Sequence, residues 1–255
     1  MSALEPLRRA ESELLSRPPS AWSRFFGSDL WYSFTRSPIT MLSALIVLLF
    51  VFGALFGPWI APYDPFNPAQ LNLMDGFTPP MSEGFSGNLY VLGTDDQGRD
   101  VFSTILYGAR ISLFVGFCAV ILAMVLGISL GLLAGYRGGW VDSLIMRIAD
   151  VQLSFPAILV ALLIFGVARA SLPRAMHGEM VIWVLIIAIG LSDWVQYART
   201  VRGTTLVEKN KEYVQAARVI GVHPLLIMVR HVLPNVLGPV LVIATIGLAL
   251  AIIAE

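Results

Sequence analysis

Long apolar segments alternate with polar connections along this chain. Five segments are long enough to cross a hydrocarbon core about 30 Å thick, because a helix rises about 1.5 Å per residue. They are approximately Ile39–Ile60, Ile111–Tyr136, Ile148–Val167, Met180–Tyr197 and Val236–Ala254. Lipid offers the backbone no hydrogen-bond partners, so each segment is predicted to be a helix. The pattern therefore predicts an all-α membrane protein.

Basic residues concentrate on alternate connections. Arg and Lys are frequent in residues 1–38 and 198–235, whereas residues 61–110 are mainly acidic. Cytoplasmic connections of membrane proteins carry an excess of Lys and Arg. We therefore expect residues 1–38 to be a cytoplasmic N-terminal segment and residues 39–60 the first transmembrane helix. Residues 61–110 then form an extracytoplasmic loop, and residues 198–235 form a cytoplasmic loop.

Composition supports the membrane assignment. The chain is 56% hydrophobic and 13% charged, about half the charged fraction of a typical soluble domain. Its net charge is zero, so no basic excess points to nucleic acid. Cys118 is the single cysteine, which excludes an intrachain disulfide and favours a buried apolar role over a reactive thiol.

The second apolar segment contains three glycines spaced four residues apart, Gly127, Gly131 and Gly135. They share one helix face, where small residues let a neighbouring backbone approach closely. We expect a helix-packing role. The contact could surround a translocation path or be ordinary intramembrane packing, and the sequence leaves both interpretations open.

No charged residue is predicted at the centre of a span. Asp150 and Asp193 are placed near cytoplasmic ends, where Arg147 and Arg199 could pair with them. A charge at mid-bilayer costs roughly 2.5–3.5 kcal/mol and often marks ion or proton pathways. This placement weakens the case for an ion-coupled transporter without excluding it. Pro156 is expected to break the third span early in its course.

The extracytoplasmic loop contains Leu92–Asp100, with the sequence Leu-Gly-Thr-Asp-Asp-Gln-Gly-Arg-Asp. Thr94 followed by Gln97 predicts a capping box at the start of a short amphipathic helix leading into the second span. A metal site is the alternative. The acidic spacing does not match a calcium loop of the EF-hand type, so the structural interpretation is preferred.

The cytoplasmic loop is predicted to hold two helices. Residues 207–220 contain no Gly or Pro and favour a first helix, which Gly221 can end in a left-handed conformation. His223 and Pro224 can begin a second helix, which residues 233–234 (Leu-Pro) are expected to end.

The resulting hairpin is expected to lie along the cytoplasmic face. Ala216 and Ala217 are small, so another protein's surface could approach there. An amphipathic connector that contacts only lipid headgroups is the alternative.

The succession Gln215-Ala216-Ala217, Gly221 and Leu233-Pro234 resembles the EAA loop of permease subunits from bacterial ABC importers. It departs from that pattern at Gln215, where the family has Glu, and at His231, where Ile is frequent. The resemblance implies a coupling helix that docks in a cleft of an ATPase subunit. The implied ATPase-coupling residues are Glu212, Tyr213, Gln215, Ala216, Ala217, Arg218, Gly221, His231, Leu233 and Pro234.

Within this set, Ala216, Ala217 and Gly221 are expected to permit close docking. The polar contacts are assigned to Glu212, Gln215 and Arg218.

Further segments resemble the C-type permease of dipeptide, oligopeptide and nickel importers. They are Leu92–Asp100, Tyr107–Ser112, Ala134–Asp142 and Tyr197–Arg202. The resemblance implies a type I ABC importer transmembrane domain, with residues 111–255 as the permease core. Such permeases have six spans, so we expect the last span to be missing from the five seen here.

The resemblance also implies a complex in the bacterial inner membrane. This multi-pass chain would pair with a homologous second permease, two ABC ATPase subunits and a periplasmic substrate-binding protein. It would hold no cofactor itself, because it lacks a phosphate-binding Gly-x-x-x-x-Gly-Lys-Ser/Thr loop and the ATPases would bind ATP and Mg²⁺.

Dipeptides or oligopeptides are the first choice of substrate, with nickel chelates and glutathione left open. An ion-coupled secondary transporter of small solutes is the alternative function. A membrane enzyme is a more distant one, since the sequence has no HExxH motif and no nucleophile elbow.

Overall fold

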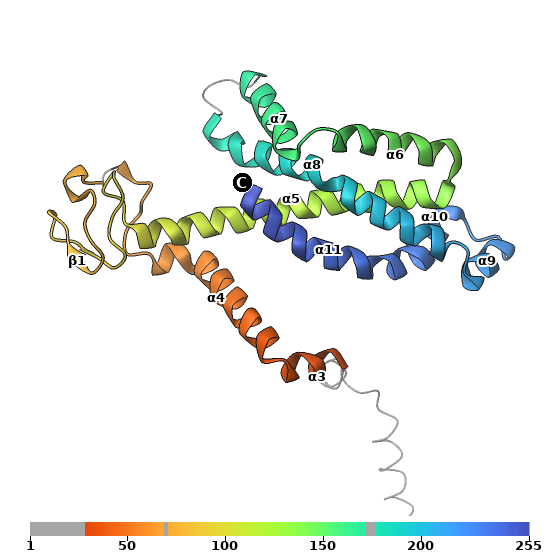
Figure 1. Ribbon diagram of the computed structural model, residues 1–255, viewed down its shortest axis with the longest axis horizontal. Helices are drawn as coiled ribbons and strands as arrows, with labels where there is room; N and C mark the ends of the chain where they lie inside the picture. The colour runs from red at the N-terminus through yellow and green to blue at the C-terminus, as the bar shows by residue number, and fades with distance from the viewer. Residues whose placement is uncertain (1–28, 69–70, 172–176, 255) are drawn as a thin grey trace, which may run out of the picture. The chain divides into compact units, whose positions relative to one another are not determined.

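A computed structural model of the chain describes residues 29–68, 71–171 and 177–254. The described residues are mostly helical, with a short two-stranded antiparallel sheet in a polar loop (Figure 1). The chain divides into two compact units, Met1–Phe56 and Gly57–Glu255.

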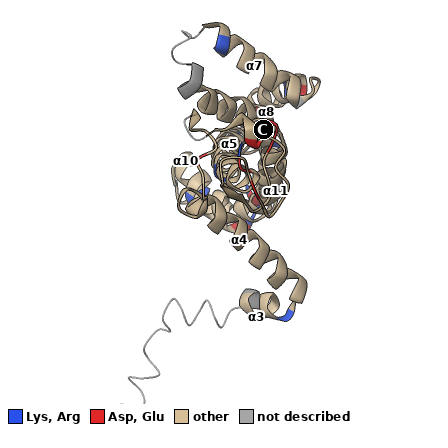
Figure 2. Cartoon of the chain, turned by 90° about the vertical axis from the view of Figure 1, so that its left-hand side faces the viewer, with Lys and Arg blue, Asp and Glu red and all other residues tan. Residues whose placement is uncertain are grey.

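The described part of the first unit holds α3 (Asp29–Arg36) and most of α4 (Pro38–Ile60). Ser37 precedes α4, and its hydroxyl accepts a hydrogen bond from the backbone N–H of Thr40 at 3.4 Å. A capping serine followed by proline in the first turn is a strong helix start. α4 is apolar on all sides and carries no charged residue, as Figure 2 shows. Such a helix suits the interior of a bilayer.

Among the described residues, four helices are long and apolar enough to cross a membrane. They are Pro38–Ile60, Val101–Arg137, Met180–Glu208 and Pro224–Ala254. A bent pair, Gly139–Leu153 with Ile158–Ser171, is a fifth candidate. The predicted all-α membrane protein with about five spans is confirmed.

The third expected span is not one helix. α6 (Gly139–Leu153) and α7 (Ala157–Ser171) meet at a bend of 91°. Pro156 has no backbone N–H and disfavours helical geometry in the residue before it, so the ladder stops there. The predicted break at Pro156 is confirmed, and the expected third span over Ile148–Val167 corresponds to this bent pair, not to one straight helix.

Three helices form the centre of the second unit: α5 (Val101–Arg137), α8 (His177–Glu208) and α11 (Leu233–Ala254). They lie side by side in Figure 1 and share buried apolar clusters. The α5–α8 contact is so close that glycine is required on α5. A Cβ added at Gly127 would lie 2.4 Å from Tyr197 Cβ, and one at Gly131 would lie 2.4 Å from the Ala198 carbonyl oxygen. Gly135 is equally confined, facing Thr205.

The polar loop before α5 belongs to the second unit and is itself folded. It contains η2 (Leu73–Asp75) and the antiparallel strands β1 (Ser82–Glu83) and β2 (Leu89–Tyr90). Asp75 is fully buried beneath the hairpin. Its carboxylate accepts hydrogen bonds from the Ser86 N–H at 3.0 Å, the Ser86 hydroxyl and the Tyr90 hydroxyl at 3.0 Å. A buried carboxylate therefore holds the hairpin closed.

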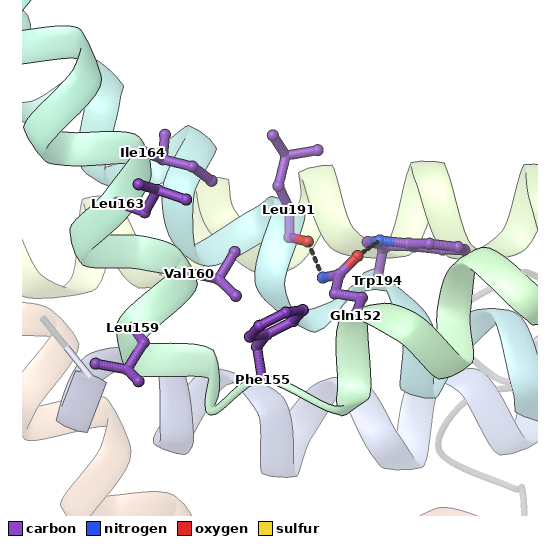
Figure 3. Close-up of a pocket in the computed structure, with 8 residues that line it drawn as sticks. All are labelled: Gln152, Phe155, Leu159, Val160, Leu163, Ile164, Leu191 and Trp194. Atoms are coloured by element: carbon purple, nitrogen blue, oxygen red, sulfur yellow. Dashed lines mark hydrogen bonds between the residues drawn. The ribbon is translucent and has the colours of Figure 1, made fainter.

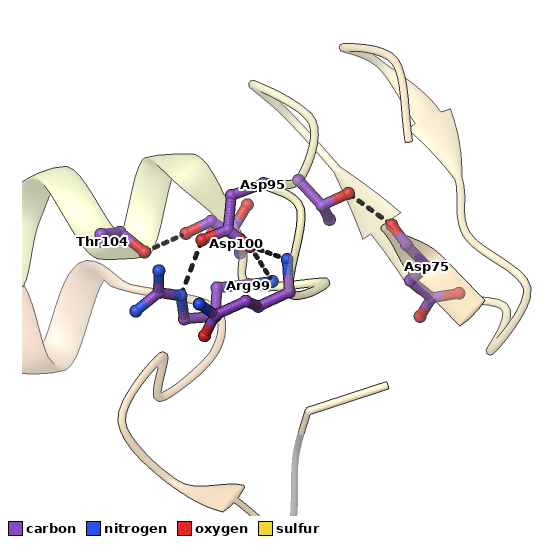
Figure 4. A network of polar contacts seen from close by, with 7 residues as sticks. Asp75, Asp95, Arg99, Asp100 and Thr104 are labelled. Atoms are coloured by element: carbon purple, nitrogen blue, oxygen red, sulfur yellow. Dashed lines mark hydrogen bonds and ion pairs between the residues drawn. The ribbon is translucent and has the colours of Figure 1, made fainter. Parts of the chain in front are cut away.

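The structure corrects the predicted start of the helix after this loop. Thr94 is not a helix cap, because its hydroxyl accepts from the Thr78 N–H at 2.9 Å. Asp95 instead closes a turn, accepting from the Arg99 N–H at 2.8 Å and Arg99 Nε at 2.7 Å (Figure 4). Gly98 has a φ of +76°, which a helix cannot accommodate.

Asp100 is the actual N-cap, accepting from the Ser103 N–H at 2.8 Å. The expected separate amphipathic helix is the first part of α5, which continues unbroken to Arg137.

Gly131→Ala tests the close α5–α8 contact. The added methyl would meet backbone atoms of α8, which cannot rotate away, so we expect a loss of about 1–3 kcal/mol of stability. Gly108→Ala on the same helix is the matched control, because nothing lies within 4 Å of its Cβ position. It should be neutral or stabilising by up to about 1 kcal/mol. Thermal unfolding in detergent measures both, and equal effects would contradict the packing model.

Acid should loosen the hairpin around Asp75. Burial raises the pKa of this carboxyl, but hydrogen bonds from Ser86 and Tyr90 outweigh it and hold the pKa below its ordinary value. A lowered folded-state pKa stabilises the fold above the unfolded pKa of about 3.9, and the effect is lost as the pH falls through the folded value. The hydrogen-exchange protection factors of residues 71–100, which compare observed with intrinsic rates, should fall in that acid range. Asp75→Asn should show fast exchange already at neutral pH, and slow exchange in that variant would refute the role.

Candidate functional site

The loop expected to couple to a partner begins where α8 ends. Sequence reasoning predicts one helix over residues 207–220, but α8 stops at Glu208 and a separate helix, α9 (Glu212–Val219), follows. Lys209 explains the break, because its ammonium donates to the Gly135 carbonyl oxygen at 2.7 Å and holds the turn on the end of α5. Asn210 Nδ2 donates to the Leu206 carbonyl oxygen at 3.0 Å and caps α8. Asn210 was the available signal, since asparagine is common at helix ends.

α9 ends as predicted, at Gly221 with a φ of +85°. The Val222 N–H donates to the Ala217 carbonyl oxygen at 3.0 Å, and the Gly221 N–H donates to the Arg218 carbonyl oxygen at 3.0 Å. This pair of bonds is the Schellman motif, which satisfies carbonyls that the helix end would leave open. The turn after α9 is therefore fixed by the backbone.

The second helix begins at the predicted place. His223 caps α10 (Pro224–Ile227), its Nδ1 accepting from the Leu225 N–H at 3.4 Å, with Pro224 in the first turn. The predicted end at residues 233–234 is wrong, since the helix runs without interruption into α11.

A π-helical segment, η4 (Met228–Val232), explains the continuity. Pro234 lacks an N–H and would crowd the carbonyl four residues earlier in a regular helix. The wider turn immediately before it relieves that conflict.

α9 is anchored to the bundle through one face. Val214 and Ala217 are buried in a cluster with Val201 of α8 and Val236 of α11. Ala217 thus serves contact within the chain. Figure 1 places α9 at the opposite end of α5 from the polar loop.

Polar contacts strengthen this anchor. The Tyr213 hydroxyl donates to the Glu208 carboxylate and accepts from Asn235 Nδ2 at 3.0 Å. Burial raises the pKa of Tyr213, and Glu208 raises it further, so the hydroxyl stays protonated. The guanidinium of Arg218 lies 5.1 Å from the centre of the Tyr136 ring of α5.

The other face of α9 is open. Glu212, Gln215 and Ala216 are exposed, and Gly221 is exposed at the tip. Sequence reasoning missed Val219 and Ile220, which are 89% and 80% exposed. Two bare apolar side chains at the end of an anchored helix are typical of a protein contact. Their position next to Gly221 was the signal that could have found them.

The remaining expected coupling residues lie further along the chain. His231 is half-buried in η4, and its Nδ1 has no hydrogen-bond partner among the described residues. Leu233 and Pro234 begin α11 and are not part of the exposed tip.

Two ion pairs join α6 to α8. Arg202 binds the Asp142 carboxylate through two nitrogens, with Nη2 at 2.7 Å, and Arg199 Nη2 lies 2.6 Å from Asp150. Asp193, which was expected near a span end with an arginine partner, has no ion pair within the described residues. It lies one helical turn before the end of the apolar segment Met180–Tyr197, and Arg199 and Arg202 follow in the same helix, so its placement near a span end stays a prediction.

An apolar pocket of about 590 Å³ lies where α6 and α7 meet α8 (Figure 3). Gln152 forms its polar corner, accepting from Trp194 Nε1 at 2.7 Å and donating to the carbonyl oxygens of Leu191 and Ser192. These hydrogen bonds satisfy the Gln152 side-chain amide. The other side chains that line the pocket are aliphatic or aromatic. The helix break at Pro156 creates the space.

Sequence comparison places this multi-span fold among transport proteins. Residues 127–255 match the family described as binding-protein-dependent transport system inner membrane component. Residues 21–80 match the N-terminal TM domain of oligopeptide transport permease C. The second match extends into the polar loop, and the first begins within α5.

Several characterised relatives are similar over most of the chain. The dipeptide transport system permease protein DppC of Haemophilus influenzae is 35% identical over 88% of this chain and 72% of its own length. The oligopeptide transport system permease protein OppC of Bacillus subtilis is 34% identical over 89% and 68%. The glutathione transport system permease protein GsiD of Escherichia coli O6:K15:H31 is 38% identical over 89% and 69%.

The chain therefore belongs to the family of inner-membrane permease subunits of ABC importers, in the group of C-type peptide permeases. It is a multi-pass membrane component without an ATPase domain. The resemblance drawn from its motifs is confirmed.

Gly221→Val tests the fixed turn after α9. Nothing lies within 4 Å of the Cβ position, so the cost comes from the backbone conformation alone. A β-branched residue at a φ of +85° should lose about 1–3 kcal/mol, whereas Gly221→Asn should lose less. Faster proteolysis of residues 209–223 would report the loss. Gly203→Ala, also in open space but inside α8, is the control, and equal protease sensitivity would contradict the account.

Proposed function

We propose that this chain forms half of the translocation path of an ATP-driven importer of dipeptides or oligopeptides. The observation that carries the proposal is α9, an anchored helix with an exposed apolar tip at Val219 and Ile220. The named relatives transport dipeptides, oligopeptides or glutathione, which are all short peptides. That common chemistry favours peptides over nickel chelates.

The proposed coupling works through rigid connections. ATPase subunits would grip the tip of α9 and displace it as they bind ATP and Mg²⁺ and close. The Schellman turn at Gly221 and the cap at His223 leave little freedom between α9 and α11. Tyr213 ties α9 to Glu208 and Asn235 at the adjoining helix ends. A displacement of α9 would therefore be transmitted to both α8 and α11.

The proposed orientation places α9 in the cytoplasm and the folded polar loop in the periplasm, with a cytoplasmic N-terminus. The excess of Lys and Arg in residues 198–235 supports it. A homologous second permease would complete the path, and a substrate-binding protein would deliver the peptide to the periplasmic side. The chain itself would need no cofactor.

Removing the apolar tip of α9 tests the coupling role. The double variant Val219→Ser and Ile220→Ser should reduce co-purification of the ATPase subunits roughly tenfold or more, because buried apolar anchors dominate such contacts. The second permease should still co-purify. Peptide uptake into proteoliposomes containing the whole complex should fall in parallel.

Phe85→Ser is the matched control, since Phe85 is 83% exposed but belongs to the polar loop at the other end of α5. It should leave ATPase association unchanged. Uptake that persists without ATP but collapses with the proton gradient would refute the proposal and favour a secondary transporter.

A further inference from the structure

Asp193 is a carboxylate without a partner in an apolar span. It lies one helical turn before the end of the apolar segment Met180–Tyr197 and is half-buried. Within residues 29–68, 71–171 and 177–254 it makes no hydrogen bond and no ion pair. An ionisable group inside a span is costly to insert and is usually retained for binding or transport. Asp193 therefore needs a partner from outside the described chain.

The neighbours of Asp193 on α8 show which way it faces. Ile189 and Tyr197, one turn before and one turn after it, share its helix face. Ile189 is buried in a cluster with Ala251 of α11, and Tyr197 is buried in a cluster with Val240 of α11. The helix face that carries Asp193 thus packs against α11 and also against Gly127 of α5, and its contact with α11 is called here the α8–α11 seam.

A second unsatisfied polar group lies in the same seam. Tyr197 is fully buried, and its hydroxyl has no hydrogen-bond partner among the described residues. It points at α11, where a Cβ added to Gly247 would lie 2.3 Å from the hydroxyl oxygen. A buried hydroxyl without a partner is uncommon and indicates a missing ligand group or a second arrangement of the seam.

The cations nearest in sequence are already engaged. Arg199 binds Asp150 at 2.6 Å, and Arg202 binds Asp142 through two nitrogens. Neither pair involves Asp193. The negative charge at Asp193 is therefore available to a cationic group that enters the seam from elsewhere.

We propose that Asp193 binds an ammonium group of the solute in transit, with the Tyr197 hydroxyl as a second acceptor when the seam opens. The proposal rests on the proposed function and adds a substrate feature to it. An ammonium group has three donors, and an ionised carboxylate only accepts, so the two match. Charge-assisted hydrogen bonds of this kind are strong where water is scarce. Peptides offer two sources, the N-terminal ammonium and a lysine side chain.

Uptake by proteoliposomes containing the whole complex tests the proposal. The probes are Ala-Lys-Ala and Ala-norleucine-Ala, which differ in the side-chain ammonium, and the variants are Asp193→Asn and Asp193→Glu. Asp193→Asn should lower uptake of Ala-Lys-Ala roughly tenfold to a hundredfold, the range for one charge-assisted hydrogen bond. A loss confined to this probe assigns the lysine ammonium. A loss of both probes that Asp193→Glu restores assigns the N-terminal ammonium.

Asp96→Asn is the matched control, because it removes an exposed carboxylate of the polar loop, and it should transport both probes normally. Unchanged uptake by Asp193→Asn would overturn the proposal. So would a loss that Asp193→Glu fails to restore, or a loss of the second permease on purification, which would indicate a structural ion pair. If the unaltered complex shows no ATP-dependent uptake of either probe, the proposed function itself fails, and this proposal with it.

Discussion

Close approach of α5 to α8 is the constraint on which the second unit depends. Lipid tails are as apolar as the side chains, so helices in a membrane gain little by burying apolar surface and must rely on dispersion contacts at short range. No side chain separates α5 from α8 at Gly127, Gly131 and Gly135, so the two helices can approach closely there. These glycines could surround a translocation path or serve ordinary packing. Both roles require the same geometry, because a path beside α5 also needs α8 to be held in place.

Polar interactions then act at the end of this contact. Lys209 donates to the carbonyl oxygen of Gly135, the last glycine of the stripe, so the turn before α9 is fixed to one end of the close α5–α8 contact. Asp142 and Arg202 fix α6 nearby through a two-nitrogen ion pair. The position of α9 thus depends on the α5–α8 contact. The exposed tip at Val219 and Ile220 is held in place by the same interactions.

The sequence was a good guide where a residue type has one dominant local effect. Apolar length predicted five spans, of which four are single helices and one is a bent pair, Pro156 predicted the break between α6 and α7, and Gly221 predicted the end of α9. Prediction from the sequence failed where contacts or turns beyond the local residue type determine the structure. The break after Glu208 depends on Lys209 reaching α5, and the helix through Pro234 depends on a π-helical turn. For the loop expected to couple to an ATPase, sequence predicted the whole of residues 216–217 to be available for docking, but burial separates Ala217, which packs inward, from the open face.

The contacts of α8 with α5 and with α11 differ in whether their polar groups have hydrogen-bond partners. Against α5, glycine brings backbone to backbone, and the stripe leaves no space for rearrangement. Against α11, the seam holds a carboxylate at Asp193 and a buried hydroxyl at Tyr197, neither with a hydrogen-bond partner among the described residues. Separating α8 from α11 would hydrate both groups, whereas separating α8 from α5 would only lose contacts. A displacement carried by α9 should therefore open the bundle along the α8–α11 seam, where we propose that Asp193 binds a cationic group.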